Sequence, residues 1–302
     1  MTGLQRRLLR WYSRHGRADL PWRVVRDPYR TVVSEFMAVQ TQVGRVAIKF
    51  ASFVERFPDF RSLAAASTAD VVREWRGLGY NSRAVRLREL AKIIIERHGG
   101  ALPTERDVLR ALPGVGPYTA AAVRVFAHGI DDAPVDVNVR RIVQRLCFGL
   151  EYPRAAAPRA IEERARALVP RGRAHDWISA LMDLGTTLCT ARAPKCPVCP
   201  LAADCAAAPV DAAALERLRK AKRRRGAQGA TPFERSSRYA RGRIVDRLRD
   251  LPAGERISLL DLQRELRPSL QGRSLNELRG FVEALERDGL VTRDGNGVAL
   301  RE

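Results

Sequence analysis

The chain has 302 residues, of which 45% are hydrophobic and 29% charged, and its formal net charge is +20. This composition excludes a disordered polymer, and the length leaves room for two or three domains. No apolar run approaches the ~20 residues that span a bilayer, so we expect no membrane association and a cytoplasmic protein. A one-signed charge of this size favours a polyanionic partner, of which nucleic acid is the most common.

The N-terminal part of the chain predicts one helix after another. Helices are expected over residues 4–13, 28–40, 43–57 and 82–98. The last of them ends at two successive glycines, which is a helix-ending signal. No strand pattern precedes the cysteine-rich segment, so this part of the chain is predicted to be all-α.

One carboxylate, that of Glu35, lies within the apolar helix expected over residues 28–40. Burial among apolar side chains raises the pKa of a carboxyl group, which can then deliver a proton. A carboxylate that faces solvent, or one that pairs with an arginine such as Arg23, is the alternative. Its nearest apolar neighbours in the sequence are Val32, Val33, Phe36 and Met37.

A glycine-containing connection leads from a short helix into a helix expected over residues 118–127. Glycines at the mouth of a helix let backbone N–H groups converge on an anion, for which a phosphate is the natural guest. Many helix corners need glycine for geometry alone, so the spacing of two glycines is weak evidence by itself. The whole connection is Leu112, Pro113, Gly114, Val115 and Gly116.

Asp136 stands between apolar residues, just before a helix that begins near Asn138. The simplest role for an acid in this place is that of an N-cap, which accepts hydrogen bonds from the first turn of the helix. The alternative is that the Asp136 carboxylate takes part in a catalysed reaction.

Four cysteines are spaced C-x6-C-x2-C-x5-C in one short segment. Thiolates packed this tightly favour a metal or cluster site over a disulfide framework, and the C-x2-C pair alone fits zinc as well as iron and sulfur. A fifth cysteine, Cys147, is expected to be a small core residue in the helix after Asp136. The four are Cys189, Cys196, Cys199 and Cys205.

The C-terminal part of the chain differs in composition. Residues 211–235 carry a basic run, which is either a solvated linker or a segment that lies along phosphates. Residues 236–302 predict three helices and then two short runs that flank Asp294, Gly295 and Asn296, a hairpin signal. This pattern predicts a small winged-helix-like α+β domain, whose fold alone does not settle its role.

In their order along the chain, the glycine connection, Asp136 and the four cysteines resemble the helix-hairpin-helix DNA glycosylase superfamily, the relatives of endonuclease III. Within it, residues 20–23 (LPWR), 34–43 (SEFMAVQTQV) and 77–80 (GLGY) resemble the adenine DNA glycosylases of the MutY type. The resemblance covers residues 10–205. It implies a six-helix barrel domain over 19–127, and a helical domain over 1–18 plus 128–210 whose four cysteines hold a 4Fe–4S cluster.

The resemblance also implies the chemistry. Glu35 would protonate adenine and then activate water, while Asp136 would stabilise the oxocarbenium-like sugar, in parallel with the two carboxylates of glycosidases. Tyr118 stands where lyase members have a lysine, and a phenol cannot form their Schiff base. We therefore expect a monofunctional glycosylase without strong lyase activity, in which Tyr118 and Asn138 orient the reacting groups.

The expected partner is double-stranded DNA that carries a mispaired base, bound by a monomer associated with the nucleoid. An enzyme that extrudes a base must fill the gap, and Gln40 and Tyr80 match the intercalating positions of the family. The hairpin residues Leu112, Gly114, Val115 and Gly116 would bind the DNA backbone. Leu20, Trp22, Arg23, Ala38 and Ser179 would form the base pocket.

Three departures from the family pattern bear on specificity. Most adenine glycosylases have LQQT at residues 38–41, so Ala38 removes bulk beside the base pocket and Val39 removes an amide, and many relatives have Gln or Glu where this chain has Ser179. Such a pocket would prefer adenine less strictly. Residues 206–302 are too few for both a linker and the Nudix-like domain that recognises 8-oxoguanine in full-length relatives.

The leading hypothesis is base excision repair of adenine mispaired with 8-oxoguanine or guanine. One alternative enzyme removes thymine or uracil opposite guanine, or another purine such as hypoxanthine. A non-catalytic DNA-binding protein on the same fold is the alternative of another class. The presence of both Glu35 and Asp136 argues against it, because a binder of a polyanion has no need of two carboxylates.

Overall fold

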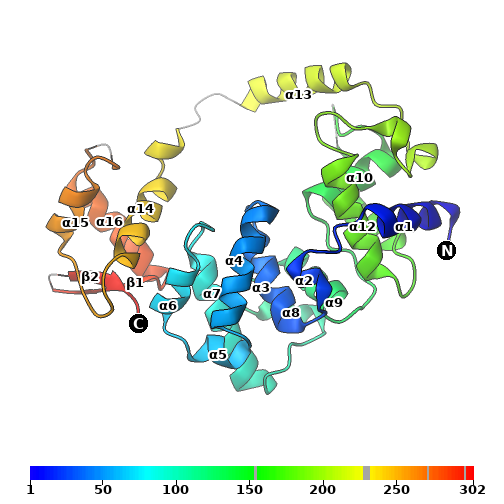
Figure 1. Cartoon of the computed structure of the whole chain (residues 1–302). Helices are drawn as coiled ribbons and strands as arrows, with labels where there is room; N and C mark the ends of the chain where they lie inside the picture. The colour runs from blue at the N-terminus through cyan, green and yellow to red at the C-terminus, as the bar shows by residue number, and fades with distance from the viewer. Residues whose placement is uncertain (153–154, 227–231, 271, 296) are drawn as a thin grey trace. The chain divides into compact units, whose positions relative to one another are not determined.

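The computed structural model describes residues 1–152, 155–226, 232–270, 272–295 and 297–302 (Figure 1). The chain divides into two compact units, each assembled from segments that are distant in the sequence. The first unit comprises Met1–Thr31, Thr104–Ala111 and Val115–Gln228. The second unit comprises Val32–Pro103, Leu112–Gly114 and Gly229–Glu302.

The first unit is a helical assembly whose core is centred on α12, where Trp177 and Leu184 are fully buried. Helices α1 and α10 both pack against α12, and α11 packs against α10. A capping box of Thr2 and Gln5 starts α1. The helices are α1 (Gly3–His15), α2 (Pro21–Val24), α8 (Arg106–Ala111), α9 (Pro117–Phe126), α10 (Val137–Phe148), α11 (Pro158–Ala167), α12 (Ala174–Thr187) and α13 (Ala212–Gly226), with short 3-10 turns at Cys196–Val198 and Ala202–Asp204.

Helix α3 (Pro28–Ala38) leads into the second unit, in which α5 and α6 both pack against α7. As expected, α7 ends at Gly99, whose φ of 61° is the left-handed conformation that glycine adopts readily. The helices of this part are α4 (Val43–Arg56), α5 (Phe60–Ala65), α6 (Thr68–Glu74) and α7 (Ser82–His98).

The C-terminal segment of the second unit contains α14 (Ser237–Arg249), α15 (Leu259–Leu266) and α16 (Leu275–Arg287), and a hairpin of β1 (Val291–Asp294) and β2 (Gly297–Leu300). The three helices expected in this segment are present, and a serine before each accepts a hydrogen bond from the third residue of that helix. The strands are antiparallel, with Val291 opposite Leu300, which confirms the predicted hairpin. The turn residue Asn296 lies outside the described residues.

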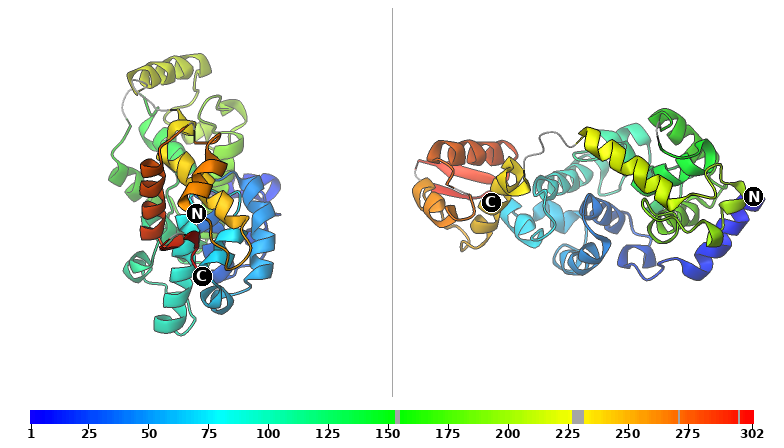
Figure 2. Two further views of the ribbon diagram at one scale, coloured as in Figure 1. Left: turned by 90° about the vertical axis from the view of Figure 1, so that its left-hand side faces the viewer. Right: turned by 90° about the horizontal axis from the view of Figure 1, so that it is seen from above.

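Helix α14 packs against α6 within the second unit (Figure 1 and Figure 2). Buried Arg249 donates to the Val72 carbonyl at 2.9 Å and to Asn81 Oδ1 at 2.8 Å, and it pairs with Asp246 at 2.7 Å. Burial lowers the pKa of its guanidinium group. The C-terminal segment is therefore joined to α6 and to the start of α7 by a buried cation as well as by apolar contacts.

Two elements differ from the expected ones. The helix predicted over residues 28–40 ends at Ala38, because Gln40 adopts a left-handed φ of 55°. Part of the expected linker forms α13, whose alanines and long straight side chains are good helix formers. In the part of the chain that the structure describes, no helix is both long enough and apolar enough to span a membrane.

A buried ion-pair cluster joins the segment after α1 to α12. Asp183 is fully buried in α12 and accepts hydrogen bonds from Arg17 at 2.6 and 2.8 Å and from Arg23 at 2.8 and 3.2 Å. Burial alone would raise the pKa of Asp183, but the hydrogen bonds and positive charges of the two arginines outweigh it and lower this pKa overall.

We expect Asp183→Asn to lower the free energy of unfolding by about 3 kcal/mol, because it leaves two half-buried guanidinium groups without their counter-charge. Urea titration at neutral pH measures the loss. Glu163→Gln is the control, since Glu163 forms an exposed pair with Arg159 that contributes about 1 kcal/mol or less. Because the pKa of Asp183 is lowered, the difference from wild type is fully present above its ordinary value near 3.8 and shrinks as the pH falls below it. Equal losses in the two variants would contradict this account.

Candidate functional site

The predicted site residues divide between the two units. Those in the first unit are Leu20, Trp22, Arg23, Val115, Gly116, Tyr118, Asp136, Asn138, Ser179 and the four cysteines of the C-x6-C-x2-C-x5-C segment. Those in the second unit are Glu35, Ala38, Gln40, Tyr80, Leu112 and Gly114.

Asp136 is the N-cap of α10, as its position in the sequence suggested. Its Oδ1 accepts hydrogen bonds from the backbone N–H groups of Asn138 at 2.9 Å and Val139 at 2.7 Å. Its Oδ2 accepts from the side-chain amide of Asn138 at 2.8 Å. Three N–H donors therefore fix the orientation of both carboxylate oxygens of this half-buried residue.

Asn138 is itself held by a half-buried arginine that also bonds to α12. Arg141 donates to Asn138 Oδ1 at 2.9 Å, to the carbonyl of Gly185 at 2.6 Å and to the carbonyl of Cys189 at 2.8 Å. A Cβ at Gly185 would lie 2.6 Å from the Cβ of Asn138, so only glycine permits this approach. A continuous set of hydrogen bonds thus leads from Asp136 to the first cysteine of the motif.

The cysteine segment closes over Arg145, whose side chain is almost fully buried. Its guanidinium donates to the Thr190 carbonyl at 2.8 Å, lies 3.7 Å from Cys189 Sγ and pairs with Glu151 at 2.7 Å. The Cys205 thiol in turn donates to the Arg145 carbonyl at 3.3 Å. Nothing in the sequence distinguishes Arg141 and Arg145 as the arginines that contact the cysteine segment.

The four thiols lie close enough to influence one another's charge. Burial raises the pKa of Cys199 to about 11, and the other three thiols of the motif contribute to the increase. A backbone hydrogen bond with Leu201 opposes it. An all-sulfur donor set with a backbone donor and two guanidinium groups beside it fits the chemistry of a thiolate-ligated cluster. Among the described residues, no three His, Cys, Asp or Glu side chains are gathered as a group that could hold a metal ion.

The predicted pocket residues of the first unit lie at α2 and in α12. Leu20 is the N-cap of α2 and Trp22 lies within it, and both are half-buried, while Arg23 in the same helix is held by Asp183. Ser179 lies one turn before Asp183 and is fully buried, and its hydroxyl oxygen has no partner among the described atoms. Asp183, which the sequence analysis missed, is therefore the residue that orients Arg23. Nothing in its sequence context, a helix of apolar residues, distinguishes it from a solvent-facing acid.

Glu35 is half-buried in α3, between the buried residues Ser34 and Phe36. Val32, three residues before Glu35, and Met37, two residues after it, are also buried. Glu35 thus belongs to a largely buried part of α3 and is itself partly exposed.

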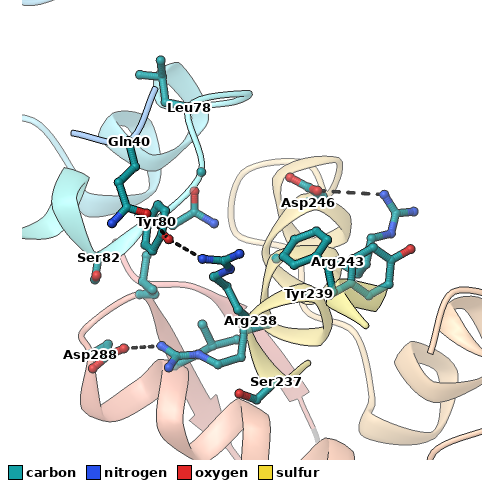
Figure 3. A pocket seen from close by; sticks show the side chains of 17 residues that line it. Gln40, Leu78, Tyr80, Ser82, Ser237, Arg238, Tyr239, Arg243, Asp246 and Asp288 are labelled. Carbon is teal, nitrogen blue, oxygen red and sulfur yellow. Dashed lines mark hydrogen bonds and ion pairs between the residues drawn. The ribbon is translucent and has the colours of Figure 1, made fainter. Parts of the chain in front are cut away.

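Gln40 and Tyr80, which we call the wedge, come together from two loops of the second unit (Figure 3). The Tyr80 hydroxyl donates a hydrogen bond to Gln40 Oε1. Both residues have left-handed backbones, with φ of 55° at Gln40 and 46° at Tyr80, although neither is glycine. This conformation costs a residue with a Cβ about 1–2 kcal/mol, so surrounding contacts must hold it.

Arg83 supplies those contacts. Its buried guanidinium donates to the carbonyls of Phe36 and Met37 at the end of α3, and at 3.0 Å to those of Leu78 and Gly79 before Tyr80. Burial lowers the pKa of Arg83 to about 10. One side chain thus fixes both backbones that carry the wedge. The sequence analysis did not single out Arg83, because its partners are carbonyls rather than acids.

The glycine connection has the geometry that the sequence suggested. Gly114 has a φ of 79°, and a Cβ there would lie 2.8 Å from the ring of Phe36. Gly116 is the N-cap of α9, with Pro117 at its first position. Leu112 and Val115 are buried, whereas Gly114 is exposed. Tyr118 is half-buried in the first turn of α9.

Comparison with known proteins gives one consistent family. Residues 33–171 match the HhH-GPD superfamily of base excision DNA repair proteins. An adenine DNA glycosylase of Mycolicibacterium smegmatis is 38% identical over 300 residues, which is 96% of each chain. A thymine/uracil-DNA glycosylase of Pyrobaculum aerophilum is 34% identical over 65% of this chain and 86% of its own.

A solved structure supports the same assignment. The structure of a thermostable thymine-DNA glycosylase superposes with a TM-score of 0.62 at 33% identity, over 67% of this chain and 93% of that one. The mostly helical fold expected from the sequence is therefore confirmed, and the only sheet among the described residues is the small antiparallel hairpin. The chain belongs to the HhH-GPD superfamily of base excision DNA repair proteins, in the branch of the adenine DNA glycosylases.

Proposed function

We propose that this protein is a monofunctional DNA glycosylase of base excision repair that hydrolyses the N-glycosidic bond of adenine mispaired with 8-oxoguanine or guanine. The observation that carries the proposal is the 38% identity with an adenine DNA glycosylase along nearly the whole chain. The fixed carboxylate of Asp136 and the half-buried carboxyl group of Glu35 support it.

Glu35 acts as the general acid. Adenine leaves poorly until a ring nitrogen is protonated, so a carboxyl group that holds a proton at neutral pH is needed beside the base. Glu35 lies in a helix whose apolar residues Val32, Phe36 and Met37 are buried, and a carboxyl group held among such side chains would retain a proton more readily. Once ionised, the same group accepts a proton from the attacking water.

Asp136 stabilises the positive charge that develops on the sugar as the base departs. Its two oxygens accept hydrogen bonds only from Asn138 and Val139 among the described contacts, and these bonds keep the carboxylate from turning during the reaction. Asn138 positions Asp136, and Arg141 positions Asn138. Tyr118 offers no amine for a Schiff base, so hydrolysis by water completes the reaction.

The four cysteines hold a 4Fe–4S cluster, in a helical domain of residues 1–18 plus 128–210. Bound there, the cluster supplies structural support and docks DNA, since four thiolate ligands leave no position open for substrate. Arg141 and Arg145 stabilise the negative charge of the thiolates. The remaining divisions are a six-helix domain over 19–127, a linker over 211–235 and a winged-helix-like domain over 236–302.

DNA binds as a duplex to a monomer, in the cytoplasm at the nucleoid. The net charge of +20 provides the sequence-independent attraction to phosphates. Leu112, Gly114, Val115 and Gly116 contact the backbone, and the wedge fills the gap that the extruded adenine leaves. Leu20, Trp22, Arg23, Ala38 and Ser179 surround the adenine.

Excision of thymine or uracil opposite guanine is the second candidate. Two similar proteins are named for thymine, at 34% and 33% identity. Ala38 and Ser179 add to this candidate, because short side chains give the pocket few atoms with which to select adenine.

A panel of duplexes tests the function. We expect the purified protein to act fastest on adenine opposite 8-oxoguanine or guanine, and more slowly on T:G, U:G and hypoxanthine pairs, as scored by alkaline cleavage of abasic sites. Borohydride should trap no efficient covalent adduct, because Tyr118 cannot form an imine. Fastest release of thymine or uracil would establish the second candidate. Binding without any release would establish a DNA-binding protein that lacks catalysis.

Replacement of the two carboxylates tests their roles. Glu35→Gln removes the proton donor and Asp136→Asn removes the negative charge, and each should lower single-turnover excision by at least about a thousandfold. Binding to duplex that carries an uncleavable adenine analogue should stay close to wild type. Glu163→Gln, an exposed change in α11, serves as the control and should excise normally. Near-normal turnover by either carboxylate variant would refute its assignment.

Replacement of the cysteines tests the cluster. Purified wild-type protein should contain about four iron and four sulfide ions per chain and show a broad visible charge-transfer absorbance. Cys199→Ser should lose that absorbance and bind DNA more weakly. Cys147→Ser should retain both properties, because Cys147 lies outside the motif. Zinc in place of iron in the wild-type protein would contradict the cluster.

A further inference from the structure

Arg238, in the first turn of α14, reaches the wedge from the C-terminal segment of the second unit (Figure 3). Its Nη1 donates a hydrogen bond to the Tyr80 hydroxyl oxygen. Its guanidinium carbon lies 5.1 Å from the centre of the Tyr80 ring and 4.8 Å from that of Phe233. The wedge and α14 both contribute residues to the lining of a cavity of about 790 Å³.

The neighbouring arginines of α14 bond to acids. Arg241 pairs with Asp288, and Arg243 lies 3.9 Å from Asp246 (Figure 3). None of the ion pairs found among the described residues includes Arg238. Its contacts are the Tyr80 hydroxyl and two aromatic rings, so its charge is directed at the wedge instead of being neutralised on its own domain.

These contacts determine the direction of the hydrogen bonds in the wedge. A guanidinium group can only donate, so the hydroxyl oxygen of Tyr80 must accept from Arg238. The single hydroxyl proton is then directed to Gln40, and it requires an acceptor there, which is Oε1. The oxygen of the Gln40 amide is thereby engaged, and its nitrogen, which only donates, is directed away from Tyr80.

The two arginines thus have different tasks at the wedge. Arg83 holds the backbone at the left-handed positions of Gln40 and Tyr80. Arg238 selects which end of the Gln40 amide is presented. With Tyr80 38% exposed and Gln40 exposed, the amide N–H groups are available to a base beside the wedge.

We propose that Arg238 is a positioning residue that sets the hydrogen-bonding polarity of the wedge, so that Gln40 presents amide N–H donors to the base left unpaired after extrusion. The inference rests on the proposed function, because it takes Gln40 and Tyr80 to be intercalated in DNA. Guanine and 8-oxoguanine carry a carbonyl oxygen at O6, whereas adenine carries an amino group at the same place. A donor-presenting wedge therefore favours guanine-type bases opposite the extruded nucleotide.

The test measures DNA binding and needs no excision. Duplexes carry a tetrahydrofuran abasic analogue in one strand, opposite guanine, 8-oxoguanine, adenine or a second tetrahydrofuran, and fluorescence anisotropy gives the Kd of each. Wild type should bind the two guanine-type duplexes about tenfold more tightly than the adenine duplex, which corresponds to the net contribution of about one hydrogen bond between neutral groups. Arg238→Ala should lose this preference and keep its Kd for the double tetrahydrofuran duplex.

Two further variants separate polarity from folding. Tyr80→Phe removes the hydroxyl that relays the direction, so it should lose the same preference as Arg238→Ala. Arg241→Ala is the matched control on the same helix and should keep the wild-type ratios. Equal weakening on all four duplexes in Arg238→Ala would indicate a structural role and overturn the proposal, as would an unchanged guanine preference.

The proposed function and this inference fail separately. If the excision panel shows release of thymine, or no release, while Arg238→Ala still erases the guanine preference, the proposed function is wrong and the inference stands. If adenine is excised but Arg238→Ala keeps the guanine preference, the proposed function stands and the inference about Arg238 is wrong.

Discussion

The side of the second unit that carries the wedge depends on one buried cation, Arg83. It donates to carbonyls at the end of α3 and in the loop before α7. The Leu78 carbonyl also accepts from the Thr41 hydroxyl, and the Gly79 carbonyl from the indole N–H of Trp75. Replacing Arg83 with an apolar side chain would remove a donor that joins the end of α3 to this loop, and two left-handed residues would lose support. Strain at the wedge is thus offset by hydrogen bonds from a buried side chain.

The first unit uses a related arrangement at Asp136. An N-cap, an amide and an arginine are joined so that each fixes the orientation of the next, and the last of them reaches the cysteine segment. In both units an arginine bonds to backbone carbonyls and thereby orients a neighbouring polar side chain. Backbone carbonyls do not move with side-chain rotamers, so positions determined in this way are rigid. This rigidity suits a site whose polar groups must stabilise a developing charge without first changing their orientation.

Features that depend on residues close together in the sequence could be predicted from it. The end of α7 at Gly99, the terminal hairpin and the cap at Asp136 each depend on residues within a few positions of one another. The pairing of Arg238 with Tyr80 spans 158 positions, and that of Arg23 with Asp183 spans 160. Arginine is abundant in this chain, so nothing local distinguishes the few buried ones from those in solvent. Their roles become visible only in three dimensions.

The contact between Gly114 and Phe36 connects the glycine-containing turn to the helix that carries Glu35. The turn that is proposed to grip a phosphate rests against the ring of the residue that follows Glu35, with no room for even a methyl group between them. A displacement of that turn upon contact with the duplex would press directly on the helix that carries the acid. In the proposed function, recognition of the DNA backbone and delivery of the proton would therefore be linked through a single aromatic ring.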